Sequence, residues 1–316
     1  MLKGESNDAV ASSMAVRAAW LHYAGGHTQA EVAKRLGLSS LKAHRLITKA
    51  NNEGIVKVYI DGDVAECVAL ETKLAERHAL AYCEVVPDLE EDYLPLRALG
   101  TAGAQFLKRT IEGTEHQSIG IGHGRTLAAC VKHLPQISFP DKQIISLLGG
   151  FSKKFAANPH DVIHQLAQRT RTSAYVMPVP FFANTAKDKK VILKQFGMNH
   201  VMQLARDTSI KIVGIGTCDT NSSMVENAML EKREIRASYK AGARGEVLGH
   251  FFGSDGKWVE TELSDRTMGL STEDLAQSYI VAVAGGNSKT KAIRSILNSG
   301  LLSGLITDER TARALF

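Results

Sequence analysis

Short apolar runs that alternate with helical segments restrict the fold of this chain more than any other feature. The runs lie at residues 81–87, 117–122, 143–150, 173–180, 210–217, 245–252 and 278–286. Strands separated by helices predict a doubly wound, mostly parallel α/β sheet, because parallel neighbours need crossover connections. In such sheets, ligands bind beyond the carboxyl ends of the strands. Residues 61–316 are therefore expected to form one α/β domain, which begins with an amphipathic helix at residues 64–80.

Two short helices are predicted in residues 10–36, ahead of this domain. Apolar residues at helical spacing in the first helix end at Gly25 and Gly26, where a left-handed cap costs little. The second helix begins with a capping box, in which the Thr28 hydroxyl can accept from the amide of Glu31 and the Glu31 carboxylate can reach back.

A tight turn and a third helix follow. Gly37 suits the positive φ of such a turn, and Ser39 or Ser40 is a fitting N-cap for a helix over residues 40–52. One face of this helix is apolar and the opposite face is basic. Residues 53–60 then turn at a glycine and alternate like a short strand. These signs predict a winged helix-turn-helix in residues 1–60, and a purely structural three-helix bundle is the alternative.

The excess positive charge of the chain lies entirely in this N-terminal part. Residues 14–60 hold seven Lys or Arg against two acidic residues, while the other residues hold 31 of each sign. That distribution is expected when one domain contacts a polyanion, although a solvated basic face has the same composition. The second helix of the motif enters the major groove of double-stranded DNA. The residues expected near base edges or phosphates are Thr28, Ser39, Ser40, Lys42, His44, Arg45 and Lys49.

Three of the predicted strands end in glycine-rich turns. Residues 120–124 read G-x-G-x-G and precede Arg125, Thr126 and a helix at residues 127–134, so that free amides, a guanidinium and a hydroxyl could gather round an anion. Residues 214–216 repeat the glycines, and residues 285–289 add Lys289 as a point charge. Any one such turn is more often structural. Three in one sheet favour a phosphorylated or polyhydroxylated ligand, and the spacing fits neither a dinucleotide fingerprint nor a P-loop.

These motifs resemble those of the SorC family of sugar-operon regulators, and the resemblance covers nearly the whole chain. It rests on the helix-turn-helix and on the runs Gly-Ile-Gly-His-Gly-Arg-Thr-Leu (120–127), Leu-Gly-Gly (148–150), Gly-Ile-Gly (214–216), Gly-Gly-x-x-Lys (285–289) and Leu-Ile-Thr-Asp-Glu-Arg-Thr-Ala (305–312). In length and detail the chain is most similar to the erythritol-catabolism repressors of this family.

The resemblance implies a regulator, expected to be a repressor, of a sugar or polyol operon. It implies a homotetramer or homodimer on palindromic operator DNA, and a domain related to sugar-phosphate isomerases that binds a sugar phosphate or polyol effector. The expected effector-binding residues are Gly122, His123, Gly124, Arg125, Thr126, Gly149, Gly216, Glu246, Lys289 and Asp308. The chain departs from the family pattern at His123 and at residues 242–246, so the usual ligand does not carry over directly.

Two other functions fit parts of the sequence. Sheets of this kind also isomerise sugar phosphates, and Asp219, Glu246 and Asp308 could transfer protons, so a sugar-phosphate isomerase-like enzyme fused to a DNA-binding module is the alternative. No motif places a general base next to a nucleophile or a metal ion. We therefore predict no catalytic residue, and we do not expect the protein to be an enzyme. A purely architectural DNA-binding protein would leave the glycine turns without a ligand.

Composition argues against several further classes. The four cysteines are widely spaced, which indicates reduced thiols rather than a disulfide framework or zinc site, and neither cofactor nor metal is expected. The N-terminus lacks an apolar segment after a basic one, and no run approaches the ~20 apolar residues that span a bilayer. The protein is therefore expected in the cytoplasm, without a membrane partner.

Overall fold

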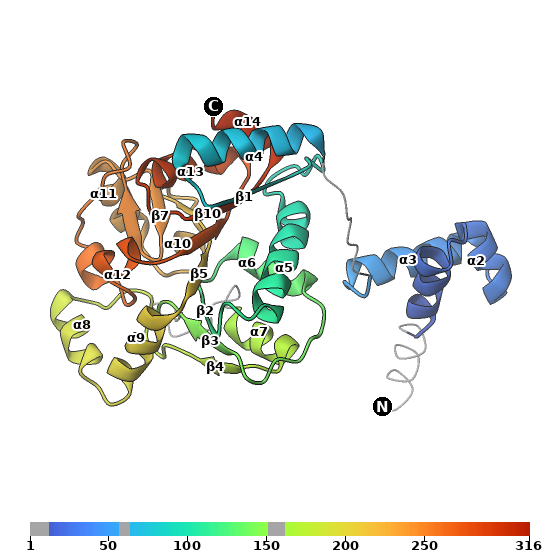
Figure 1. Cartoon of the computed structure of the whole chain (residues 1–316), viewed down its shortest axis with the longest axis horizontal. Helices are drawn as coiled ribbons and strands as arrows, with labels where there is room; N and C mark the ends of the chain where they lie inside the picture. Colours follow the sequence, from blue (N-terminus) through green and yellow to red (C-terminus); the bar gives the residue numbers. More distant parts are fainter. Residues whose placement is uncertain (1–12, 57–63, 151–161) are drawn as a thin grey trace. The chain divides into compact units, whose positions relative to one another are not determined.

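The computed structural model describes residues 13–56, 64–150 and 162–316 of the chain (Figure 1). Two compact units are present, Met1–Asp61 and Gly62–Phe316, and each has its own buried apolar clusters. Among the described helices, none combines the length and the apolar character that a membrane crossing needs.

The N-terminal unit is built from short helices. Residues 13–19 are α-helical and continue as a π-helical turn, η1 (Trp20–Ala24), after which the amide of Gly25 donates to the carbonyl of Trp20. The helices α2 (Gln29–Leu36) and α3 (Ser40–Asn52) follow. Their shared core is small, with Val32 and Ile47 as its largest buried side chains.

The local signals in this unit act as the sequence predicts. The Thr28 hydroxyl accepts from the Glu31 amide at 3.3 Å, and the Glu31 carboxylate accepts from the Thr28 amide at 2.8 Å. Gly37 ends α2 with a φ of +65°, and the Ser39 hydroxyl caps α3. Gly54 turns the chain with a φ of +65°, but residues 57–60 of the predicted wing strand lie outside the described residues.

Within the described residues, seven parallel strands form the central sheet of the C-terminal unit. Their order is β1-β10-β9-β5-β2-β3-β4. The strands are β1 (Tyr82–Val86), β2 (Ser118–Ile121), β3 (Gln143–Ser146), β4 (Ser173–Tyr175), β5 (Ile210–Val213), β9 (Ile280–Val283) and β10 (Gly304–Asp308). The helices are α4 (Ala65–His78), α5 (Leu96–Glu112), α6 (Arg125–His133), α7 (Ile163–Thr170), α8 (Ala186–Leu193), α9 (Met198–Asp207), α10 (Ser223–Glu226), α11 (Lys232–Lys240), α12 (Thr272–Ala276), α13 (Thr290–Asn298) and α14 (Glu309–Ala314).

Helices cover both faces of this sheet, which confirms the doubly wound α/β prediction. Successive residues of a strand point to opposite faces. Accordingly, each face of the sheet has its own apolar cluster. Ile144 and Val281 belong to one cluster, and their neighbours Ile145 and Ile280 belong to the other. The helices α5, α6 and α7 contribute to the cluster that holds Ile144, while α4, α9 and α13 contribute to the opposite one (Figure 1). Burial on both faces explains why the strands read as apolar runs.

The order of the strands reverses beside β2. From β2 the chain moves to β3 and β4 on one side, and it then returns to β5 on the other side before it reaches β9 and β10. Connections that leave β2 and β5 therefore diverge and open a crevice at the carboxyl ends of these two strands. In doubly wound sheets this is the place where ligands bind.

The predicted strand at 245–252 is wrong as part of the parallel sheet, and only the first half of the predicted strand at 210–217 belongs to it. In residues 245–252, Leu248 and Gly249 have φ of +51° and +83° and turn the chain into a hairpin of β7 (Gly245–Val247) and β8 (His250–Phe252). The run at 210–217 also divides, because its end forms β6 (Gly216–Thr217), which pairs antiparallel with β7. The main sheet instead includes β10, which is absent from the predicted strands.

Candidate functional site

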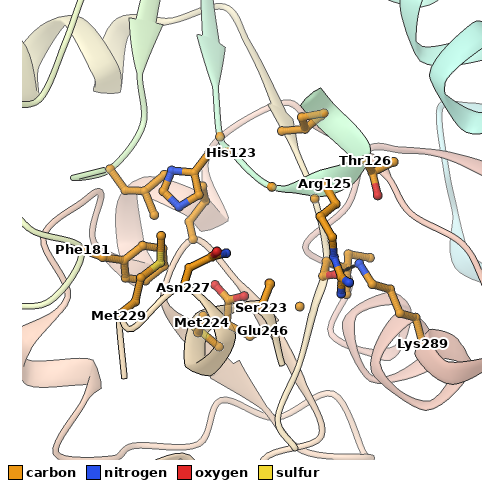
Figure 2. Close-up of a pocket in the computed structure, with 18 residues that line it drawn as sticks. His123, Arg125, Thr126, Phe181, Ser223, Met224, Asn227, Met229, Glu246 and Lys289 are labelled. Atoms are coloured by element: carbon orange, nitrogen blue, oxygen red, sulfur yellow. Dashed lines mark hydrogen bonds between the residues drawn. The ribbon is translucent and has the colours of Figure 1, made fainter. Parts of the chain in front are cut away.

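A polar pocket lies at the carboxyl ends of β2 and β5, where the strand order reverses (Figure 2). The loop after β2, the start of α6, the segment after β5, the region of α10 and the β7 hairpin all contribute to it. The lining residues are Gly122, His123, Gly124, Arg125, Thr126, Leu127, Leu148, Phe181, Gly214, Ile215, Gly216, Ser223, Met224, Asn227, Met229, Glu246, Leu248 and Lys289. Segments far apart in the sequence therefore meet in one site.

The first turn of α6 supplies one end of the pocket. Gly124 caps this helix with a φ of +126°, a conformation that favours glycine. Ala128 is the first residue of the helix whose amide donates to a carbonyl of the same turn, that of Gly124. The amides before it have no carbonyl within the helix to bind, and the helix dipole makes this end positive. With Arg125 and the buried Thr126 beside it, the turn suits an anion or several hydroxyl oxygens.

Lys289 and Glu246 bring opposite charges into the same pocket. The Lys289 ammonium donates to the carbonyl of Ile215 at 2.7 Å. The pKa of Lys289 is lowered to about 8, mainly by burial and also by the nearby Arg125, and the charge of Glu246 opposes this change. Burial also raises the pKa of Glu246 to about 7, against the effects of a hydrogen bond from the Gly249 amide and of Lys289. Two ionisable groups whose pKa values lie near neutral pH thus line the pocket.

The other end of the pocket is mainly apolar. The rings of His123 and Phe181 lie 5.3 Å apart, and Met229 lies beside Phe181 in Figure 2. Ser223, Asn227 and Glu246 lie between this end and the cations (Figure 2). The pocket therefore offers cationic donors at one end, hydrogen-bonding side chains in the middle and an apolar surface at the other end, an arrangement suited to a small polar ligand with a carbon skeleton.

Eight of the ten predicted effector residues line this pocket, and Gly149 and Asp308 do not. The Gly149 amide donates to the carbonyl of Met268, and a Cβ at Gly149 would lie 2.2 Å from the carbonyl oxygen of Pro180, so this glycine permits close backbone packing. Asp308 is 2% exposed and caps α14, where it accepts from the amides of Thr311 and, across the loop, of Gly286.

No motif in the sequence predicts the wall of the pocket that is formed by Phe181, Ser223, Met224, Asn227 and Met229. These residues come from α10 and from irregular segments that carry no glycine motif, and only tertiary packing brings them to the strand ends. In the sequence, only a polar run at residues 219–223 indicates that this segment could contribute to a binding site.

Six of the seven predicted DNA-contacting residues lie on α3 or at its N-cap, and the seventh, Thr28, is the N-cap of α2. Lys42, His44 and Arg45 are exposed, opposite the buried Ala43 and Ile47. A groove on this helix is lined by His44, Arg45, Thr48, Lys49, Asn52 and Glu53.

Several of these side chains already have partners within the unit. Ser39 and Thr28 cap the helices. Lys49 lies 3.6 Å from Glu53, and His44 contacts Gln29 at 3.2 Å. Arg45 and Lys42 are therefore the basic residues of α3 for which the structure records no such contact within the described residues.

A helix-turn-helix unit joined to an α/β domain with a polar pocket at its switch point is the organisation of a ligand-controlled transcriptional regulator. Residues 62–316 match the family described as "Putative sugar-binding domain". The chain belongs to the SorC family of sugar-binding transcriptional regulators.

Two curated relatives support this assignment, and a solved structure has the same fold. The chain is 55% identical to the Erythritol catabolism regulatory protein EryD of Brucella abortus, over 96% of each chain. It is 31% identical to the Transcriptional regulator LsrR of Klebsiella pneumoniae, over 96% of this chain and 92% of the relative. The full-length Sorbitol Operon Regulator SorC from Klebsiella pneumoniae has the same fold, with a TM-score of 0.70 and 24% identity over 96% of this chain and 98% of that one.

Proposed function

We propose that this protein represses a sugar or polyol catabolic operon, and that a sugar phosphate or polyol in the pocket at β2 and β5 controls its binding to operator DNA. The observation that carries the proposal is the meeting of the α6 amides, Arg125, Lys289 and Glu246 in one pocket. Amides and cations bind phosphate or hydroxyl oxygens, and a carboxylate accepts hydrogen bonds from hydroxyl groups.

Residues 1–60 would read the operator and residues 61–316 would bind the effector and assemble the oligomer. One helix-turn-helix covers one half-site, so a homodimer or homotetramer on a two-fold symmetric operator would multiply specificity. Val64, the N-cap of α4, and Val68 on α4 are 41% and 39% exposed, which supports α4 as a contact between copies. Light scattering that finds a monomer both free and on DNA would contradict this assembly.

The pocket would bind its ligand without turning it over, in the cytoplasm, where a bacterial operator is found. The relatives named above are regulators, which supports this view. Asp219, one of the candidate acids, accepts from the amide of Asn221 and is not among the lining residues. An assay for isomerisation of pentose and hexose phosphates tests the enzyme alternative, and turnover that depends on Glu246 would establish it.

Operator binding and thermal unfolding, measured with and without ligand, test the proposal. The Brucella relative is named for erythritol catabolism, so erythritol and inorganic phosphate are the first probes. At ~100 times its dissociation constant a ligand should stabilise the chain by about 2.7 kcal/mol. Linkage requires that the factor by which the effector changes operator affinity equals the factor by which the operator changes effector affinity.

Two pocket variants and one variant of α3 separate the two sites. Lys289→Ala and Thr126→Ala should keep operator binding and lose the response to effector. Arg45→Ala should lose operator binding and keep effector affinity. Full effector response in both pocket variants would mean that the effector binds elsewhere and that the glycine turns are structural.

A further inference from the structure

Arg125 already has a carboxylate of the same chain as its partner. Its Nη1 lies 3.7 Å from Oε2 of Glu226, the last residue of α10. Arg125 belongs to the lining of the pocket, whereas Glu226 does not, and the Glu226 side chain is 53% exposed. One of the two cations of the proposed effector site is therefore paired with an anion at the edge of that site.

Buried anchors hold Glu226 in this place. Met224 is 4% exposed, and its carbonyl accepts from the amides of Met229 and Leu230 at 2.8 and 3.1 Å. The amide of Glu226 itself donates to the carbonyl of Ser222 at 3.1 Å. Because its backbone is fixed, the Glu226 side chain loses only its own rotamer freedom when it stays beside Arg125.

The second cation, Lys289, also faces a negative charge. Glu246 is 7% exposed and lines the same pocket, and its charge opposes the lowering of the Lys289 pKa that burial causes. Two cations and two carboxylates are thus gathered at the site. A bound phosphate group, with a charge of about −1.5 to −2, would be repelled by the Glu226 carboxylate and, above pH 7, by that of Glu246 as well, whereas an uncharged polyol would not be repelled.

We propose that Glu226 sets the ligand specificity of the pocket, because its carboxylate competes with an anionic effector for Arg125 and leaves uncharged polyols unaffected. The inference rests on the effector site proposed above. An exposed ion pair is weak, so it can be displaced by a ligand, yet it still lowers anion affinity by a measurable factor.

Isothermal titration of the full chain with inorganic phosphate and with erythritol tests the role of Glu226. Glu226→Gln should bind phosphate about threefold to tenfold more tightly than the unchanged protein, through loss of the competing charge. Its affinity for erythritol should stay the same within about twofold. Equal phosphate affinity in the two proteins, or no phosphate binding by either, would overturn the inference, as would a parallel gain for erythritol.

A double-mutant cycle shows whether Glu226 acts through Arg125. In an Arg125→Gln background, Glu226→Gln should no longer raise phosphate affinity, because the partner for which it competes is absent. Glu260→Gln removes the same charge from an exposed position on the segment after β8 and should leave phosphate affinity unchanged. A gain that persists without Arg125, or that Glu260→Gln reproduces, would mean a general charge effect and would overturn the inference.

The outcomes also separate this inference from the proposed function. If phosphate or erythritol binds in a Lys289-dependent manner and Glu226→Gln does not change either affinity, the proposed effector site is supported and the proposed role of Glu226 is wrong. If Lys289→Ala leaves all binding unchanged, the effector site itself is wrong and the role of Glu226 falls with it.

Discussion

Gly216 and Glu246 are paired directly across β6 and β7, and a Cβ added to Gly216 would lie 2.2 Å from Oε2 of Glu246. The other carboxylate oxygen of Glu246 accepts from the amide of Gly249. The carboxylate is therefore held between a backbone amide on one side and a glycine Cα on the other. The φ of Gly216 lies outside the left-handed region, so its backbone conformation does not require glycine. Glycine is required at this position because the Glu246 carboxylate approaches its Cα so closely.

Gly216→Ala should displace the Glu246 carboxylate from the pocket. The added methyl group cannot share the space of Oε2, so Glu246 must move or lose its hydrogen bond to Gly249. We expect effector affinity to fall at least tenfold and the free energy of unfolding to fall by about 1–3 kcal/mol. Titration with the effector and chemical denaturation measure the two effects.

Gly214→Ala is the matched control for folding. The nearest heavy atom to a Cβ at Gly214 is the carbonyl oxygen of His123, at 3.7 Å, which is an ordinary contact. This variant should unfold at the denaturant concentration of the unchanged protein. If Gly216→Ala were as stable as Gly214→Ala and bound effector normally, neither folding nor effector binding would depend on the position of the Glu246 carboxylate.

The stability of the domain should depend on pH through Glu246. Burial raises the pKa of this carboxyl to about 7 from its ordinary value of 4.5. The stability that it contributes is therefore fully present below pH 4.5 and is lost as the pH rises through 7. Lys289, whose pKa is about 8, keeps most of its proton over this window.

Glu246→Gln removes this titration and isolates its effect. Between pH 5 and pH 7.5, the unfolding free energy of the variant, relative to that of the unchanged protein, should increase by about 2 kcal/mol. Urea denaturation of both proteins across this range measures the difference, and the other titrating groups cancel in it. A difference that stays constant with pH would show that Glu246 keeps an ordinary pKa.

The parts of the fold that local chemistry determines could be predicted. The bounds of α3 and the caps of α2 depend on residues within one turn, such as Thr28, Glu31 and Ser39. The hairpin at residues 245–252 could not, because an apolar run conceals the turn at Leu248, a residue that rarely adopts a positive φ.

The pocket likewise has one part that the sequence predicts and another part that it does not. Its glycine-rich wall at residues 122–126 carries a sequence signal because tight turns and helix starts need particular residues. Phe181 and Asn227 reach the pocket through packing between distant segments, for which no short motif exists. Asp308 shows the converse, since its motif serves a helix cap instead of the pocket.

Thr28→Ala should loosen α2 without unfolding the chain. The substitution removes both hydrogen bonds of the Thr28 hydroxyl with Glu31, and loss of such a cap costs about 1 kcal/mol. Hydrogen exchange of the α2 amides should therefore become roughly fivefold faster. Thr28→Ser keeps the hydroxyl and should exchange like the unchanged protein, so equal acceleration in both variants would argue against the capping box.

Arg45→Ala and Lys42→Ala should weaken operator binding in different ways. Both side chains are exposed on α3, opposite Ala43 and Ile47, so neither substitution opens the core. A base-contacting arginine is worth about 1–3 kcal/mol, and its loss relaxes the preference at one position of the operator. A lysine on phosphate weakens binding to all sequences and lowers the slope of log affinity against log salt by about one.

Lys187→Ala separates these effects from the loss of one positive charge. Lys187 is exposed on α8 in the other unit, outside both proposed binding sites and outside the proposed contact between copies, so this variant should bind the operator like the unchanged protein. Fluorescence anisotropy with operator and scrambled DNA at several salt concentrations distinguishes the three variants. If Arg45→Ala bound operator as tightly as Lys187→Ala at matched salt, α3 would not be the helix in the major groove, because an exposed guanidinium in the groove contributes to DNA affinity.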